Sequence, residues 1–243
     1  AETIARRAEI AADLRQIDSE PHVSAAVTAQ RINLDRTPVA EVASVHITQQ
    51  KSAAITHGGF TGAQDALPDT SIVAIIGVNQ GGVVNGAGTG FTGGTTYIQG
   101  TDYKLTAGKV DWSLAGAEVA TSSTYNVIYQ CIAAVEETAK DDTGFTITGA
   151  VVGTQVLVSY SQKLPRIDTL CLADDGALVW VKGVAADYNP QKPAIPGSML
   201  ALASVNQNWL ASRSVTNDGV RVVPMQELAN MNARMDYLAS LIA

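Results

Sequence analysis

The feature that most constrains the fold is a run of very short alternating segments between Tyr97 and Ser113. Apolar and polar residues alternate from Tyr103 to Leu105 and again from Lys109 to Trp112, and glycine or aspartate separates the segments. Alternation with a period of two is typical of β-strands, and Gly and Asp at this spacing are typical of tight turns. This stretch of sequence contains no nucleophile, metal-ligand cluster or phosphate loop. The pattern therefore favours a structural or docking β-domain over an enzyme.

Composition permits a sizeable core and narrows the range of partners. The 243 residues are 46% hydrophobic and 16% charged, with a net charge of −7. Such a chain can form one large domain or two to three small ones. Nucleic acid is not expected as a partner, because phosphate binding requires a basic patch and the only Lys/Arg cluster is Arg6-Arg7. Membrane insertion is not expected either, because the apolar run Ile72–Ile76 is far shorter than the ~20 residues that span a bilayer.

The expected fold is mainly β, with an antiparallel β-sandwich over residues 41–163. Strands are predicted from Val42 onward, at Ile72–Val78 as a fully buried strand, at Thr124–Cys131 and at Gln155–Ser161. Residues 137–154 are expected to form a polar hairpin. Residues 81–94 contain seven glycines and are expected to form a flexible loop outside the core.

A small second β module is predicted over residues 164–223, after Leu164-Pro165. Two apolar segments, Thr169–Leu172 and Ala177–Val181, flank the turn sequence Asp174-Asp175-Gly176, which is typical of a β-hairpin. Three prolines between residues 190 and 196 indicate a stretch without regular structure.

Flanking N- and C-terminal α-helices complete the expected fold. Residues 1–18 are rich in alanine with apolar residues near one face, and Glu20-Pro21 should end this helix. An extended docking arm is expected from there to residue 40.

The C-terminal helix over residues 224–243 is predicted to begin at Pro224. Its apolar residues are separated by 3, 4, 3 and 4 positions, which is the a/d seam of a coiled coil. The seam consists of Leu228, Met231, Met235, Leu238 and Ile242. Two heptads also suit an amphipathic helix that packs on its own domain. Because the seam continues to the last residues without a cap, we expect the start of a stalk.

Motifs that could carry chemistry occur without the context that they require. Gly88–Gly93 matches G-x-G-x-x-G, but a dinucleotide site needs this motif between a strand and a helix, and strand-forming residues follow it here. His57-Gly58-Gly59 resembles an oxyanion-hole turn, but no G-x-S-x-G nucleophile motif accompanies it. His22, His46 and His57 lack the spacing of a zinc site. We therefore expect no cofactor, no metal site and no enzymatic activity.

Three other groups of residues are interpreted as structural. Asp141-Asp142 and Asp174-Asp175 lie in turn-rich stretches, where Asp supports local hydrogen bonds. The tryptophans are interpreted as core anchors, with a carbohydrate platform as the alternative; they are Trp112, Trp180 and Trp209. Cys131 and Cys171 are expected to be separate buried thiols, with a disulfide bridge as the alternative.

A series of short motifs extends over nearly the whole chain. They are Glu20-Pro21-His22, Ile55-Thr56-His57-Gly58, Asp65-Ala66-Leu67-Pro68, Gly100-Thr101-Asp102-Tyr103, Val110-Asp111-Trp112-Ser113, Ser123-Thr124-Tyr125, Leu164-Pro165-Arg166-Ile167-Asp168, Leu170-Cys171-Leu172, residues 182–190 and residues 217–225. With these motifs the sequence resembles a family of tailed-bacteriophage virion proteins, tail or baseplate components that carry a domain of unknown function. The Gly-rich stretch 81–94 departs from the family pattern, which passes more directly from the buried strand to the Tyr97 strand.

The resemblance implies a structural virion protein, assembled in the host cytoplasm, that joins the baseplate or tail to receptor-binding fibres. It implies other tail and baseplate proteins as partners and a homotrimeric state, and it supplies no catalytic residues. The seam from Leu228 to Ile242 fits a trimeric stalk independently, although Met at core positions specifies the oligomeric state poorly. One alternative is a carbohydrate- or receptor-binding module of a tail fibre. Another is a hydrolase that acts on cell-wall polysaccharide.

Overall fold

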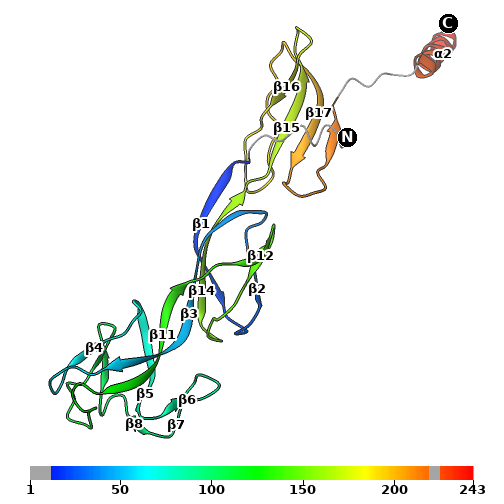
Figure 1. Cartoon of the computed structure of the whole chain (residues 1–243). Coiled ribbons are helices and arrows are strands. Elements are labelled where there is room, and N and C mark those ends of the chain that lie inside the picture. Colours follow the sequence, from blue (N-terminus) through cyan, green and yellow to red (C-terminus); the bar gives the residue numbers. More distant parts are fainter. Residues whose placement is uncertain (1–11, 219–224, 243) are drawn as a thin grey trace. The chain divides into compact units, whose positions relative to one another are not determined.

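The computed structural model describes residues 12–218 and 225–242 of the chain (Figure 1). Within these residues the protein is built from antiparallel strands and a C-terminal helix, so the mainly β prediction is confirmed. The chain divides into two compact units. We call Leu14–Lys163 the central unit, and Leu164–Ala243 together with Ala1–Asp13 the C-terminal unit.

A six-stranded antiparallel sheet forms the frame of the central unit. In spatial order its strands are β1 (Leu14–Val23), β14 (Gln155–Lys163), β3 (Val39–Thr56), β11 (Thr124–Ala134), β5 (Ile72–Gln80) and β8 (Thr95–Tyr97). Strand β3 has 18 residues. Its first half pairs with β14 and its second half with β11. A single strand therefore runs through both halves of the unit.

Each half of this sheet has its own three-stranded sheet and its own apolar cluster. One small sheet contains β4 (Gln64–Ala66), β10 (Lys109–Asp111) and β9 (Lys104–Thr106); the other contains β12 (Thr138–Asp141), β13 (Gly144–Ile147) and β2 (Gln30–Asn33). The aromatic cluster includes Val110 of β10 together with Tyr125 and Tyr129 of β11. The aliphatic cluster includes Phe145 of β13 and Val158 of β14. The core is thus divided in two, and a single β-sandwich is not confirmed.

The short segments between Tyr97 and Ser113 form strands, as their alternation predicts. Thr106 of β9 pairs with Lys109 of β10 around a two-residue turn. Both turn residues, Ala107 and Gly108, have positive φ angles of 49° and 76°. Two successive positive φ angles are the geometry of a type I′ turn, which matches the twist of antiparallel strands.

The predicted N-terminal helix is wrong where the structure describes it. Residues 14–18 belong to β1, in which Leu14 pairs with Lys163 and Ile17 with Tyr160. Ile17 also packs against the aliphatic cluster. Pairing and burial therefore outweigh the weak helical preference of the segment. Pro21 is tolerated within β1 because this is an edge strand. Residues 1–11 lie outside the described part of the chain, and the expected docking arm instead supplies β2 and the start of β3.

Strand β5 also differs from its prediction. Ile75 and Val78 are buried in the aromatic cluster, whereas Val73 and Ile76 are exposed. An antiparallel strand buries one face against the core, so alternate side chains of β5 point away from the cluster. The prediction of a fully buried strand is therefore wrong.

The C-terminal unit contains a four-stranded antiparallel sheet and the C-terminal helix. In spatial order its strands are β16 (Leu178–Val181), β15 (Arg166–Leu172), β17 (Leu200–Gln207) and β18 (Val215–Asn217). The predicted β15–β16 hairpin is confirmed, and Gly176 in its turn has a positive φ angle of 84°. The predicted C-terminal helix is α2 (Met225–Ile242). Residues 182–199, which hold the three prolines, contain no strand or helix.

Candidate assembly surface and buried polar sites

The exposed face of α2 is the candidate assembly surface. Met231, Met235 and Leu238 are 60%, 65% and 53% exposed. At spacings of four and three residues, these side chains lie on one face of the helix. Leu228 and Ile242 belong to the same helix and continue the spacing, but their side chains lie outside the described part. Because burying one such side chain stabilises by roughly 1.5–3 kcal/mol, this face favours contact with another apolar surface.

The second notable site is a buried histidine between two carboxylates in the central unit. His57 Nδ1 lies 2.8 Å from Asp65 Oδ2, and His57 Nε2 lies 2.9 Å from Glu118 Oε1. The imidazole itself is fully buried. Each ring nitrogen is thus within hydrogen-bonding distance of a carboxyl oxygen. The three side chains therefore form a compact buried clamp, with the His57 imidazole between two carboxyl groups.

Backbone amides and ring donors complete the hydrogen bonding of this clamp. Asp65 accepts from Tyr125 Oη at 2.8 Å and from Trp112 Nε1 at 3.1 Å. Gly58 N donates to Asp65, and Gly62 N donates to Glu118. Burial raises the pKa of the Tyr125 hydroxyl, so this group remains a donor over the whole ordinary pH range. The clamp joins residues 57–65 to Trp112, Glu118 and Tyr125.

A second buried ionic network lies in the C-terminal unit. Arg166 and Asp168 of β15 are both fully buried, and Arg166 Nε donates to Asp168 Oδ1 at 2.9 Å. Gly183 N and Gln207 Nε2 also donate to Asp168. The guanidinium carbon of Arg166 lies 5.1 Å from the centroid of the Trp209 ring, within the range of a cation–π contact. Arg166 and Asp168 are two positions apart on a strand, so the sequence itself places them on one face.

The Gly-rich stretch forms an anchored hairpin, and the prediction of a flexible loop is wrong for its strands. β6 (Val83–Val84) pairs with β7 (Phe91–Thr92). The buried Asn79 side chain accepts from Gly82 N at 2.8 Å and donates to Gly93 O at 3.0 Å. A Cβ atom on Gly94 would lie 2.3 Å from Gly82 N, so the close approach of the two hairpin arms requires glycine. The G-x-G-x-x-G motif Gly88–Gly93 therefore belongs to a hairpin, with strands on both sides of it.

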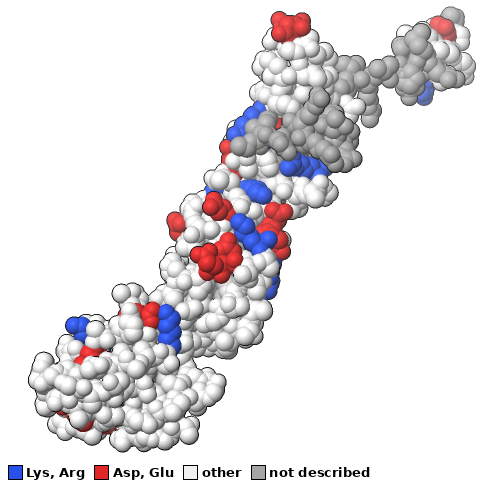
Figure 2. Space-filling view, viewed as in Figure 1, with Lys and Arg blue, Asp and Glu red and all other residues white. Residues whose placement is uncertain are grey.

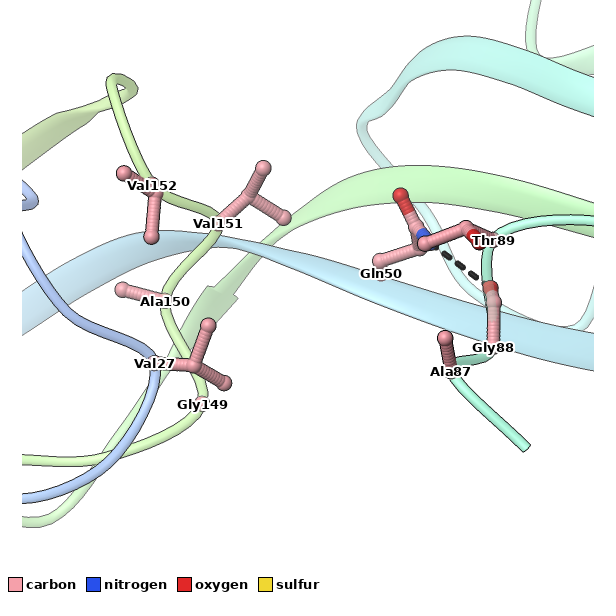
Figure 3. A pocket seen from close by; sticks show the side chains of 9 residues that line it. All are labelled: Val27, Gln50, Ala87, Gly88, Thr89, Gly149, Ala150, Val151 and Val152. Atoms are coloured by element: carbon pink, nitrogen blue, oxygen red, sulfur yellow. Dashed lines mark hydrogen bonds between the residues drawn. The ribbon is translucent and has the colours of Figure 1, made fainter.

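The tip of this hairpin borders a cleft of about 420 Å³ (Figure 3). Gln50, Ala87, Gly88 and Thr89 lie on one side of the cleft, and Val27 and residues 149–152 lie on the other. Gln50 Nε2 donates to Gly88 O at 2.7 Å, and Gln50 Oε1 accepts from Gln130. The volume falls within the range of small-molecule sites, but the amide that faces the cleft is already used to hold the hairpin. We assign no ligand to this cleft.

The cysteines and tryptophans occupy mainly structural positions. Cys131 and Cys171 are both unbridged and buried, which confirms the prediction of separate thiols. Trp112 is fully buried in the aromatic cluster, and its ring lies 5.2 Å from Tyr97 in an edge-to-face arrangement. Trp180 and Trp209 are half-buried in the C-terminal unit. A carbohydrate platform that uses all three tryptophans is inconsistent with the burial of Trp112.

Positively and negatively charged side chains are mixed on one part of the surface of the central unit. Figure 2 shows Lys, Arg, Asp and Glu together around β1, β2 and β12 on the face that it draws. Arg31 and Asp141 there form an ion pair at 2.6 Å, and Lys163 and Asp142 form one at 3.4 Å. Among residues 12–218 and 225–242, no group of three or more His, Cys, Asp or Glu side chains could hold a metal ion. No helix in the described chain is long and apolar enough to cross a membrane.

These observations describe a β-rich protein with two buried, hydrogen-bonded polar sites and an amphipathic helix whose apolar face is exposed. The chain belongs to the family described as a domain of unknown function (DUF4815), whose model matches residues 4–243. No match to the chain was found among curated proteins or among solved structures.

Proposed function

We propose that this protein is a structural component of a phage tail, an adaptor that joins the tail or baseplate to receptor-binding fibres as a homotrimer. The observation that carries the proposal is the exposed apolar face of α2, formed by Met231, Met235 and Leu238. An amphipathic helix whose apolar side is exposed in the single chain is suited to bind equivalent helices of other copies. The motif resemblance to tail and baseplate proteins supplies the setting in which such an assembly would act.

The buried polar sites support a mechanical role over a chemical one. The carboxyl groups of Asp65, Glu118 and Asp168 each take part in two or more hydrogen bonds within the same chain. Groups that are hydrogen-bonded in this way fix the relative position of strands and loops. They tie the fold together and leave no group poised to act on a substrate.

The composition of α2 favours more than two helices in the bundle. Leu241 is exposed and lies beside the seam, three residues after Leu238. The apolar face is therefore wider than the narrow a/d stripe of a two-stranded coiled coil, so it can contact two neighbours at once. Two heptads alone give a marginal assembly, because short helices gain little from each contact.

Sedimentation analysis of the full chain tests the assembly. We expect a trimer, and we expect a monomer when Met231→Asp and Leu238→Asp are combined, because both charges lie in the seam. The matched control combines Ala233→Asp and Ser240→Asp, which have the same seven-residue separation on the opposite face of α2. The control should remain trimeric. A monomeric full chain, or equal dissociation of both variants, would contradict the trimer.

Purified virions test the setting. We expect the protein in tail preparations by mass spectrometry, and we expect gold-labelled antibody against it at the fibre-bearing end of the tail in electron micrographs. Antibody against the major capsid protein is the control for labelling. Absence of the protein from purified particles that infect normally would contradict the proposed role.

A further inference from the structure

One face of strand β15 carries buried charged residues in its first half and half-buried leucines in its second half. Alternate residues of a strand share a face, so Arg166, Asp168, Leu170 and Leu172 lie on the same side of the sheet. The first two are fully buried in the ionic network. The two leucines are only half-buried. The covered part of this face therefore ends after Asp168, and its apolar part is left partly open.

The neighbouring strands extend this open region into a patch. Leu172 pairs with Leu178 of β16 and with Leu200 of β17, and Leu170 pairs with Trp180 of β16. Directly paired residues on antiparallel strands project from the same face. Leu178 is 59% exposed and Leu200 is 47% exposed. We define the leucine patch as Leu170, Leu172, Leu178, Trp180 and Leu200.

The C-terminal unit needs a cover for this patch. Among the described residues, both clusters of buried apolar side chains belong to the central unit. A small sheet gains its stability from burying an apolar face against a second layer. In addition, β16 is an edge strand of sequence Leu-Val-Trp-Val, without the Lys or Pro that protects exposed edges. The exposed leucine patch and the unprotected edge of β16 are both features of protein–protein interfaces.

The chain order identifies a second copy of this protein as the occupant. Strand β18 ends at Asn217 and α2 begins at Met225. The intervening residues can span at most about 30 Å, so helices joined in one bundle keep their sheets close to one another. Linked in this way, the sheets meet at an effective concentration in the millimolar range. A second apolar contact also supplies the area that two heptads lack.

We infer that the leucine patch is a second contact between copies, covered in the trimer by the C-terminal unit of a neighbouring chain. This inference rests on the proposed trimer. The patch extends the interface from the helix seam to the sheet, so that the C-terminal unit completes its core only upon assembly.

Thiol labelling of the full chain tests the inference. Leu178→Cys places a thiol in the patch, and Val184→Cys places one at an 80% exposed position of the same unit outside it. The native thiols do not compete, because Cys131 and Cys171 are fully buried and burial raises the pKa of both. We expect a maleimide to label Leu178→Cys at least ~10-fold more slowly in the assembled chain than in the Met231→Asp, Leu238→Asp background. Val184→Cys should label at the same rate in both.

The outcomes separate this inference from the proposed function. A trimer in which Leu178→Cys labels as fast as in the dissociated background would overturn the patch contact and leave the helix bundle intact. A full chain that sediments as a monomer would overturn both. As a second measurement, Leu178→Lys combined with Leu200→Lys should weaken assembly by at least ~10-fold at unchanged circular dichroism, whereas Val184→Lys should not. Unchanged assembly of the double variant would also overturn the contact.

Discussion

Both units are built from antiparallel strands, but they bury different kinds of side chains. In the central unit, aromatic and aliphatic residues fill two clusters, with Trp112 and Phe145 fully buried. In the C-terminal unit, the fully buried side chains include Arg166 and Asp168, whereas Leu178 and Leu200 are exposed. Strand pairing alone therefore does not show which unit buries an apolar interior. The central unit buries two apolar clusters, whereas the C-terminal unit leaves two leucines of the leucine patch largely exposed.

The two cysteines allow the units to be followed separately. Cys131 lies in the aromatic cluster of the central unit, and Cys171 lies in β15 of the C-terminal unit. Each thiol becomes reactive only when its surroundings open. Labelling in the Cys171→Ala and Cys131→Ala backgrounds therefore reports the stability of the central and C-terminal units, respectively.

The largest effect is expected from Trp112→Ala in the central unit. The substitution removes a buried ring that contacts Tyr97 and Tyr125, and it removes a hydrogen bond to Asp65. We expect a loss of about 3–5 kcal/mol in the free energy of unfolding, measured by urea dependence of Cys131 labelling. Phe60→Ala, at an exposed position, is the control and should change stability by less than about 0.5 kcal/mol. An equal loss in unfolding free energy measured by Cys171 labelling would contradict separate unfolding of the two units.

The corresponding substitution in the C-terminal unit is Arg166→Met. It leaves the Asp168 carboxylate fully buried without its cation, which we expect to cost about 3 kcal/mol, measured by Cys171 labelling. The control is Lys182→Met, which removes the 2.8 Å ion pair between Lys182 and Asp13 at an exposed position. It should cost less than about 1 kcal/mol. If both substitutions cost the same, the buried network does not form the interior of this unit.

A smaller and more local effect is expected from Asn79→Ala. The substitution leaves Gly82 N and Gly93 O without their side-chain partner, at a cost of about 1–3 kcal/mol. Hydrogen exchange should accelerate in residues 81–94 and remain unchanged in β15. The exposed Thr92→Ala in β7 is the control. Unchanged exchange in Asn79→Ala would mean that the hairpin does not depend on this amide.

The smallest effect is expected on the stability of the central unit at acidic pH. Hydrogen bonds from Ser113 hold the pKa of Asp111 at about 2, below the ordinary value of 3.8. A lowered folded-state pKa contributes stability above pH 4, and this contribution is lost as the pH falls toward 2. Asp111→Asn should remove about 1–2 kcal/mol of this dependence, measured by Cys131 exposure after acid incubation. Lys104→Met, which removes only a 3.8 Å ion pair with Asp111, should retain most of it.

Local pattern was enough to predict the elements that form from neighbouring residues. Thr124–Cys131 and Gln155–Ser161 alternate clearly and lie within β11 and β14. The β15–β16 hairpin and helix α2 were also predictable, because a turn sequence and a heptad spacing are contained within a few residues. The N-terminal prediction failed because the partner of Leu14–Asp18 is β14, almost 150 residues away.

The polar sites and the leucine patch could not be predicted in the same way. His57 and Glu118 lie outside the strands and 61 residues apart, and no local signal indicates their contact. The patch requires the register of three strands, since Leu172, Leu178 and Leu200 are neighbours only across the sheet. Arg166 and Asp168 are the exception: two charges at alternate positions of an otherwise apolar strand indicate a shared buried face. That signal was present in the sequence, and it could have identified the ionic network.

The continuous strand β3 has a mechanical consequence for the central unit. Its hydrogen bonds to β14 and β11 run across the strand from Val39 to Thr56. Backbone bonds of an antiparallel ladder stand at right angles to the chain, so tension along β3 loads them in shear, many at a time. Both halves of the central unit are joined through this one strand. Stretching the unit along β3 therefore requires many of these hydrogen bonds to break together.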